Sequence, residues 1–110
     1  MMRVLLVSFS VLPTLQNYMY LTADSLQKMK IEVHTLGVDN GTADLRRDKN
    51  HFFLPKVNTP IPSVKSIKQM NANIDGIIFL IEKIQPDVIH FVSKHTWNYF
   101  LINRLKKAHF

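Results

Sequence analysis

Four short apolar runs are separated by segments with a different pattern. The first and last, residues 3–8 and 88–92, are apolar at nearly every position, which is typical of strands in a parallel sheet with helices on both sides. Residues 31–36 alternate apolar and polar side chains and are closed by Gly37, which also predicts a strand. Residues 51–57 form a further predicted strand, and Pro55 places it at a sheet edge because proline donates no ladder hydrogen bond.

Three segments between or after these runs carry apolar residues at helical spacing. From Leu15 the stripe continues through Met19, Ala23, Leu26 and Met29, after a polar turn that holds Ser10, Pro13 and Thr14. A second stripe that includes Asn71 predicts one long helix over residues 63–84, with Ser63 as its N-cap and a possible bend near residues 71–76. Pro86 must then turn the chain. The last predicted helix starts at Thr96 and points four residues inward: Trp97, Phe100, Leu101 and Leu105.

The segment of residues 38–50 is polar, and Asn40-Gly41 within it is a turn signal. The element order is therefore β-α-β-loop-β-α-β-α. Right-handed crossovers then predict the strand order 3-2-1-4. We expect one α/β domain over residues 1–110: a Rossmann-like, doubly wound, mainly parallel sheet with helices on both faces.

This order leaves the strand of residues 88–92 with a partner on one side only. It has no proline or lysine to blunt its outer edge, so we expect it to recruit another strand and to support a homodimer. In a longer parent enzyme a fifth strand would occupy this edge. Lysine at Val92, expected at the exposed end of the strand, should reduce association.

Composition narrows the class of protein. No apolar run approaches the roughly 18 residues of a membrane span, and residues 4–7 are too short for a signal peptide, so a cytoplasmic setting fits best. The absence of cysteine excludes disulfides, thiolate metal sites and a cysteine nucleophile. The formal charge of +6 is dispersed and lacks interleaved aromatic residues, which argues against nucleic acid. A solvated basic face and attraction to phosphate or a membrane surface both stay open.

Several chemical signatures are missing from the sequence. Three glycines, Gly37, Gly41 and Gly76, cannot build a dinucleotide fingerprint or a phosphate-cradling loop. There is no Gly-x-Ser-x-Gly elbow and no pair of carboxylates at a strand end. His90 is expected to be a hydrogen-bonded core histidine. No carboxylate motif accompanies His90 and His95, so we predict no metal site, and we expect no cofactor.

Ligands of such sheets bind beyond the carboxyl ends of the strands, where the strand order reverses. Here this is the crevice between residues 8–14 and residues 93–96, where a helix begins whose free N–H groups suit an anion. Alternatively, Ser93 and Thr96 simply cap that helix. The candidate substrate-binding residues are Ser8, Ser10, Thr14, Ser93, Lys94 and His95.

Three segments carry a resemblance to a known family: Arg3-Val4-Leu5-Leu6-Val7-Ser8, residues 21–36, and Gln85-Pro86-Asp87-Val88-Ile89-His90. They resemble the N-terminal domain of retaining glycosyltransferases of the GT-B type, family four. Residues 93–101, with His95, Trp97 and Asn98, are similar to a subgroup that makes cell-surface or capsular polysaccharide.

The resemblance implies sugar transfer from a nucleotide-sugar donor to a glycan or lipid-linked acceptor. In this family the N-terminal domain mainly holds the acceptor, and its basic face often touches the membrane. The donor site lies in a second domain, so catalytic residues are expected beyond Phe110. A 110-residue piece of the enzyme should then show no turnover by itself.

Two departures from the family pattern stand out. Pro13-Thr14-Leu15-Gln16 occupies the place of a frequent Gly-Gly turn, and Val92 replaces the second histidine of a His-x-His. The alternative function is a non-catalytic Rossmann-like module that binds a nucleotide or a protein. Within that class, a receiver domain would need acidic residues where this chain has Ser8 and Ser10.

Overall fold

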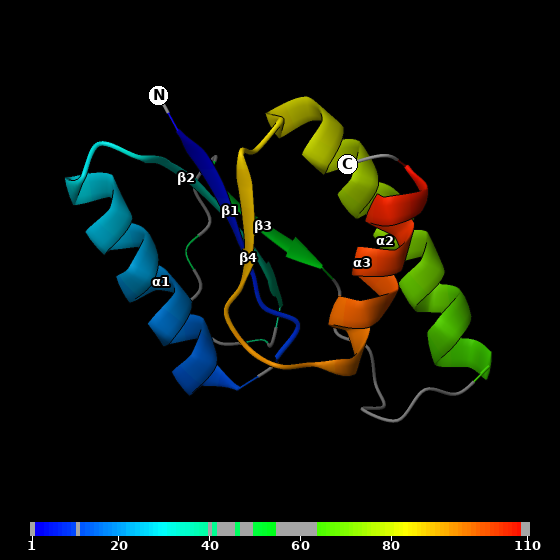
Figure 1. Ribbon diagram of the computed structural model, residues 1–110. Coiled ribbons are helices and arrows are strands. Elements are labelled where there is room, and N and C mark those ends of the chain that lie inside the picture. Colours follow the sequence, from blue (N-terminus) through cyan, green and yellow to red (C-terminus); the bar gives the residue numbers. More distant parts are fainter. Residues whose placement is uncertain are drawn as a thin grey trace. The chain divides into compact units, whose positions relative to one another are not determined.

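The computed structural model describes residues 2–10, 12–39, 41, 46, 50–54 and 64–108, with side chains except at 64–67 and 70. Four parallel strands pair in the order β3-β2-β1-β4, so the predicted α/β, Rossmann-like fold and its strand order are confirmed. The strands are β1 (Arg3–Val7), β2 (Glu32–Val38), β3 (His51–Leu54) and β4 (Val88–Phe91), and the helices are α1 (Pro13–Lys28), α2 (Val64–Ile84) and α3 (Thr96–Lys107) (Figure 1).

The chain divides into two compact units. The first comprises Met1–Lys56 and Pro86–His95 and contains the sheet and α1. The second comprises Val57–Gln85 and Thr96–Phe110 and contains α2 and α3.

The core of the first unit lies between α1 and one face of the sheet. Successive strand residues point to opposite faces, so Val4 and Leu6 share the face that α1 covers, and Val33 lies beside Val4 in register. Met19, Tyr20 and Ala23 of α1 pack onto them, and all six side chains are buried. Burying a side chain of the size of leucine or valine contributes about 1.5–3 kcal/mol.

Both ends of α1 follow from local sequence. The helix starts at Pro13, two residues before the predicted stripe, because proline needs no N–H partner in the first turn. At the other end Lys30 has a left-handed φ of 62°, and the Ile31 N–H reaches back to the Leu26 oxygen at 3.2 Å. This is a Schellman ending, in which Leu26 and Ile31 form the usual apolar pair against the core. Met29 is therefore past the helix, and its predicted burial is wrong: it is 70% exposed.

Several strand boundaries differ from the prediction. β1 ends at Val7 rather than at residue 8, and β2 begins at Glu32 rather than at residue 31. β2 does not close at Gly37 but continues to Val38, because residues 37 and 38 still pair with Phe53 and Leu54. β4 ends at Phe91, although the Val92 N–H still donates to the Val7 oxygen at 2.9 Å. The predictions that involve Asn40, Pro55, Val57 and Ser63 fall outside the described residues.

β4 is less buried than its apolar sequence indicates. The register places Val88 beside Val4 and His90 beside Leu6, on the face that α1 packs against. α1 covers β1 and β2, however, so Val88 is 43% exposed and His90 is exposed as well. The predictions of a core histidine at residue 90 and of burial on both faces are wrong. Val92, expected at an exposed end, instead packs partly buried against the core.

The second unit consists of α2 and α3. Trp97, Leu101 and Leu105 of α3 are buried as predicted, whereas Phe100 is half-buried. Four isoleucines of α2 are buried as well: Ile74, Ile77, Ile81 and Ile84. Asn71, predicted on the same stripe, is exposed. Arg104 forms an ion pair with Asp75, which joins the two helices. No helix in the described ranges has both the length and the apolar character to cross a bilayer.

Candidate functional site

Two of the serines predicted to line a crevice at the ends of β1 and β4 lie side by side. Val7 pairs with Phe91 at the end of the two strands, so the residues that follow emerge side by side. The Ser8 and Ser93 hydroxyl oxygens lie 3.2 Å apart, and either can donate. The Ser8 N–H also donates to the Leu36 oxygen at 2.9 Å, so the sheet fixes the position of this serine. Ser8 is buried and Ser93 is half-buried.

His95 lies beside the ring of Phe9, which follows Ser8 in the chain. Their ring centroids are 6.1 Å apart, and Phe9 is buried. Burial lowers the pKa of His95 below its usual 6.5, because the low-dielectric surroundings disfavour the imidazolium. At neutral pH the ring is thus neutral, with one nitrogen that donates and one that accepts.

The other three predicted site residues, Ser10, Thr14 and Lys94, do not take part in the contact between Ser8 and Ser93. The Ser10 hydroxyl accepts the Leu12 N–H at 3.1 Å and so braces the turn into α1. Thr14 and Lys94 are exposed. α3 begins at Thr96 as expected, and anion binding at its first amides stays a prediction, as does the alternative capping role of Ser93 and Thr96.

Gln16 is a positioning residue of this loop that the sequence did not reveal. Its side chain is buried, and its Nε2 donates to the backbone oxygens of Ser10 and Val38, each at 3.2 Å. The amide therefore ties the loop after β1 to the end of β2. Gly37 makes room for it, because a Cβ at residue 37 would lie 2.7 Å from Gln16 Oε1. The signal in the sequence was the polar side chain of Gln16 directly after Leu15, where the apolar stripe of α1 begins.

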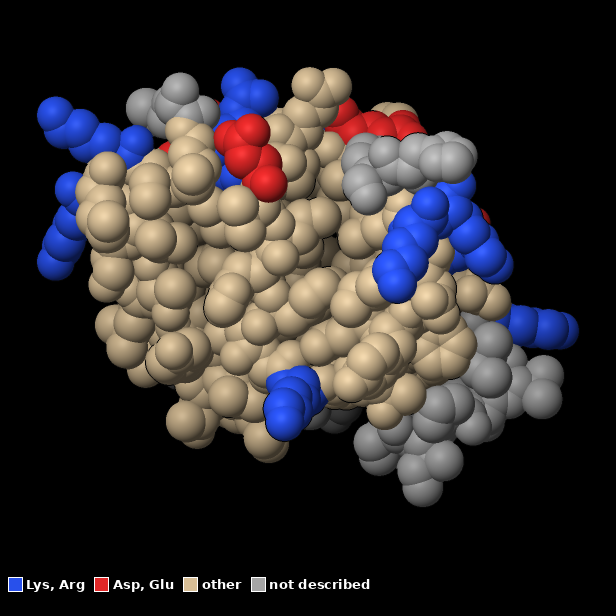
Figure 2. Space-filling model, viewed as in Figure 1, with Lys and Arg blue, Asp and Glu red and all other residues tan. Residues whose placement is uncertain are grey.

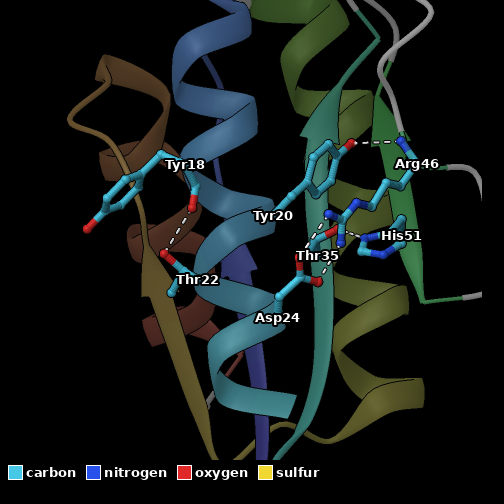
Figure 3. Close-up of polar contacts among 7 residues, drawn as sticks. All are labelled: Tyr18, Tyr20, Thr22, Asp24, Thr35, Arg46 and His51. Carbon is cyan, nitrogen blue, oxygen red and sulfur yellow. Dashed lines mark hydrogen bonds and ion pairs between the residues drawn. The ribbon is translucent and has the colours of Figure 1, made fainter. Parts of the chain in front are cut away.

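A second polar cluster lies on the other flank of α1, away from Tyr18 (Figure 3). Arg46 donates two hydrogen bonds to the Asp24 carboxylate, at 2.6 and 2.9 Å. The Arg46 N–H donates to the Tyr20 hydroxyl at 3.2 Å, and the guanidinium lies 4.9 Å from the centre of that ring. This clamp holds residue 46 against α1.

The same cluster also attaches β3 to β2. The edge of the Tyr20 ring faces His51, with centroids 5.3 Å apart. His51 Nδ1 lies 2.6 Å from the Thr35 hydroxyl, so one ring nitrogen is engaged in a structural contact. Sequence reasoning treated Arg46 as one of many dispersed basic residues and missed the cluster.

The clamp predicts a pH-dependent contribution to stability. The hydrogen bonds from Arg46, opposed in part by burial, lower the pKa of Asp24 below its usual 3.8. A carboxylate with a lowered pKa stabilises the fold above its unfolded pKa, and this contribution is lost as pH falls through the folded value. We expect Asp24→Asn to lower the free energy of unfolding at pH 7 by about 1 kcal/mol or less, as for other exposed pairs. The difference from the wild type should shrink as pH falls below 4.

Urea unfolding of both proteins between pH 7 and pH 2 measures this difference. Glu82→Gln, which changes an exposed carboxylate on α2, is the matched control and should show no comparable loss at pH 7. An Asp24→Asn effect that stays constant over this pH range would contradict the clamp.

In comparisons with known proteins, no family model, curated protein or solved structure matches the chain. Among the described residues, no group of three or more His, Asp or Glu side chains is placed to hold a metal ion.

Proposed function

We propose that the chain is the acceptor-side domain of a glycosyltransferase, which holds a cell-surface glycan or a lipid-linked acceptor while a nucleotide-sugar supplies the sugar. The observation that carries the proposal is the Ser8–Ser93 contact at the carboxyl ends of β1 and β4. This is where a Rossmann-like sheet of this strand order binds its ligands. The resemblance of residues 3–8 and 85–90 to that family supplies the reaction class.

The chemistry of the crevice favours an uncharged, hydroxyl-bearing ligand. Two serine hydroxyls and a neutral imidazole can each donate and accept, as sugar hydroxyls do. Pro13 and Thr14 stand where a diphosphate-binding turn would need glycine, which favours the acceptor over the donor. The proposal places the parent enzyme in the cytoplasm, with its basic surface near a membrane and without a nucleic-acid partner.

The second candidate is a non-catalytic module of the same fold that binds a nucleotide or a protein. One observation favours it: residues 8–14 and 93–96 contain no Asp or Glu to act as a catalytic acid or base.

Titration of the ¹⁵N-labelled chain tests the two candidates. The probes are neutral oligosaccharides of glucose, galactose and N-acetylglucosamine and, separately, uridine diphosphate. We expect an oligosaccharide to shift the amides of Ser8, Ser93 and His95. Ser93→Ala should weaken that binding roughly twofold to tenfold, which corresponds to one neutral hydrogen bond.

Ser25→Ala is the control, because Ser25 is an exposed serine of α1 outside the crevice. It should leave the affinity unchanged. Shifts of the crevice amides by uridine diphosphate alone would support the nucleotide-binding module instead. If no oligosaccharide moves these amides, the glycosyltransferase proposal is wrong.

A further inference from the structure

The outer edge of β4 presents backbone groups that no strand of this chain pairs with in the described ranges. β4 pairs with β1 alone. The Val92 N–H donates to the Val7 oxygen at 2.9 Å, and Phe91 lies beside Val7 in register, so the backbone of Val92 points toward β1. Successive residues of a strand point their N–H and C=O groups to alternate sides. His90, two residues earlier, therefore also directs its groups toward β1, whereas Ile89 and Phe91 direct theirs away. The side chains of Val88 and His90 are exposed.

The surface along this edge lacks charge. Residues 88–91 carry no Lys, Arg, Asp or Glu, and the nearby exposed residues of α1 include Tyr18 and Leu21. Figure 2 shows the face with β4 and α1, where charged side chains lie mostly at the margins. In a chain of formal charge +6, such a surface is where a second copy meets the least repulsion.

We propose that a second copy of this chain pairs with β4 in antiparallel orientation. With a twofold axis at Ile89, Ile89 of each copy lies opposite Ile89 of the other, and Val88 of each copy lies opposite residue 90 of the other. The Ile89 pair exchanges both of its backbone hydrogen bonds, and the two pairs of residues 88 and 90 are the non-hydrogen-bonded neighbours. The edge is thus complementary to itself, as an isologous dimer interface must be, and the sheet continues through both copies.

The charges at the two ends of β4 favour the same orientation. Asp87 is exposed just before the strand, and Lys94 is exposed shortly after it. Antiparallel pairing brings the acidic end of one copy toward the basic end of the other. Parallel pairing would place like charges together, which costs free energy.

Sedimentation equilibrium of the 110-residue chain tests the proposal, and the wild type should be a dimer. Val88→Lys and His90→Lys should each raise the dimer dissociation constant at least about tenfold, because the two added cations lie near the axis, opposite or diagonal across the strands. Circular dichroism should stay unchanged, since both side chains are exposed. Ser25→Lys adds the same charge on an exposed part of α1 and should remain dimeric. Val92 is unsuitable for this test because it packs against the core.

Hydrogen exchange provides a second readout. The Ile89 and Phe91 amides should be protected in proportion to the dimer present. A wild type that stays monomeric at its highest soluble concentration would overturn the proposal. So would lysine variants that remain dimeric, or protection of both amides in the monomer, which would mean that another segment of the chain covers the edge. These results do not depend on what the crevice binds.

Discussion

Leu6→Ala is expected to lower the free energy of unfolding by about 3 kcal/mol, because it leaves a cavity in the centre of the first unit. Leu6 is 1% exposed and packs with Met19 and Val33 between β1 and α1. β1 is also the central strand that pairs with both β2 and β4. The loss should therefore appear as a lower midpoint in guanidinium unfolding with an unchanged slope.

Leu21→Ala removes the same atoms from a side chain that is 56% exposed. It should change the free energy of unfolding by about 0.5 kcal/mol or less. Equal losses for the two variants would mean that α1 packs on the sheet through a different face.

Gly37→Ala is expected to cost about 2 kcal/mol, although alanine normally suits a strand at least as well as glycine. The new Cβ would lie 2.7 Å from Gln16 Oε1, so the glutamine side chain must move. Its two hydrogen bonds to the Ser10 and Val38 oxygens would then break inside the protein. Leaving buried polar groups unpaired costs about 1–3 kcal/mol for each group, less whatever the site can recover by relaxing.

A double-mutant cycle with Gln16→Ala isolates this contact. Once the glutamine is shortened, Gly37→Ala should cost almost nothing, so the two changes should couple strongly. Gly76→Ala is the control, because no atom lies within 4 Å of its added Cβ and α2 should gain about 0.5–1 kcal/mol. Additive losses at residues 16 and 37 would show that the steric contact is not the cause.

The strand order could be predicted because it depends only on element order and on the handedness of crossovers. The extent to which each strand is buried could not be predicted from the sequence. An apolar run such as residues 88–91 looks the same whether or not a helix covers it, and α1 covers β1 and β2 instead. The predicted burial of Met29 was wrong for a local reason. The periodicity of apolar residues does not reveal that Lys30 adopts a left-handed conformation and ends the helix.

The candidate site was predictable where it depends on the backbone. Ser8 and Ser93 meet because parallel strands in register end together. Gln16 was missed because its partners are backbone oxygens of the loop after β1 and of the end of β2, and Arg46 because its partners Tyr20 and Asp24 are distant in sequence. Such partners are set by tertiary packing, which periodicity does not record.

The strand order also fixes the sequence of events while the chain is being synthesised. β1 can pair with β2 as soon as residue 38 has emerged, since residues 32–36 are its partners there. Its other edge must wait for β4, which pairs with residues 4–7 through residues 88–91. Contacts this distant in sequence slow folding. During that interval β1, rather than β4, is the strand with an open edge, and a nascent chain is most exposed to mispairing there.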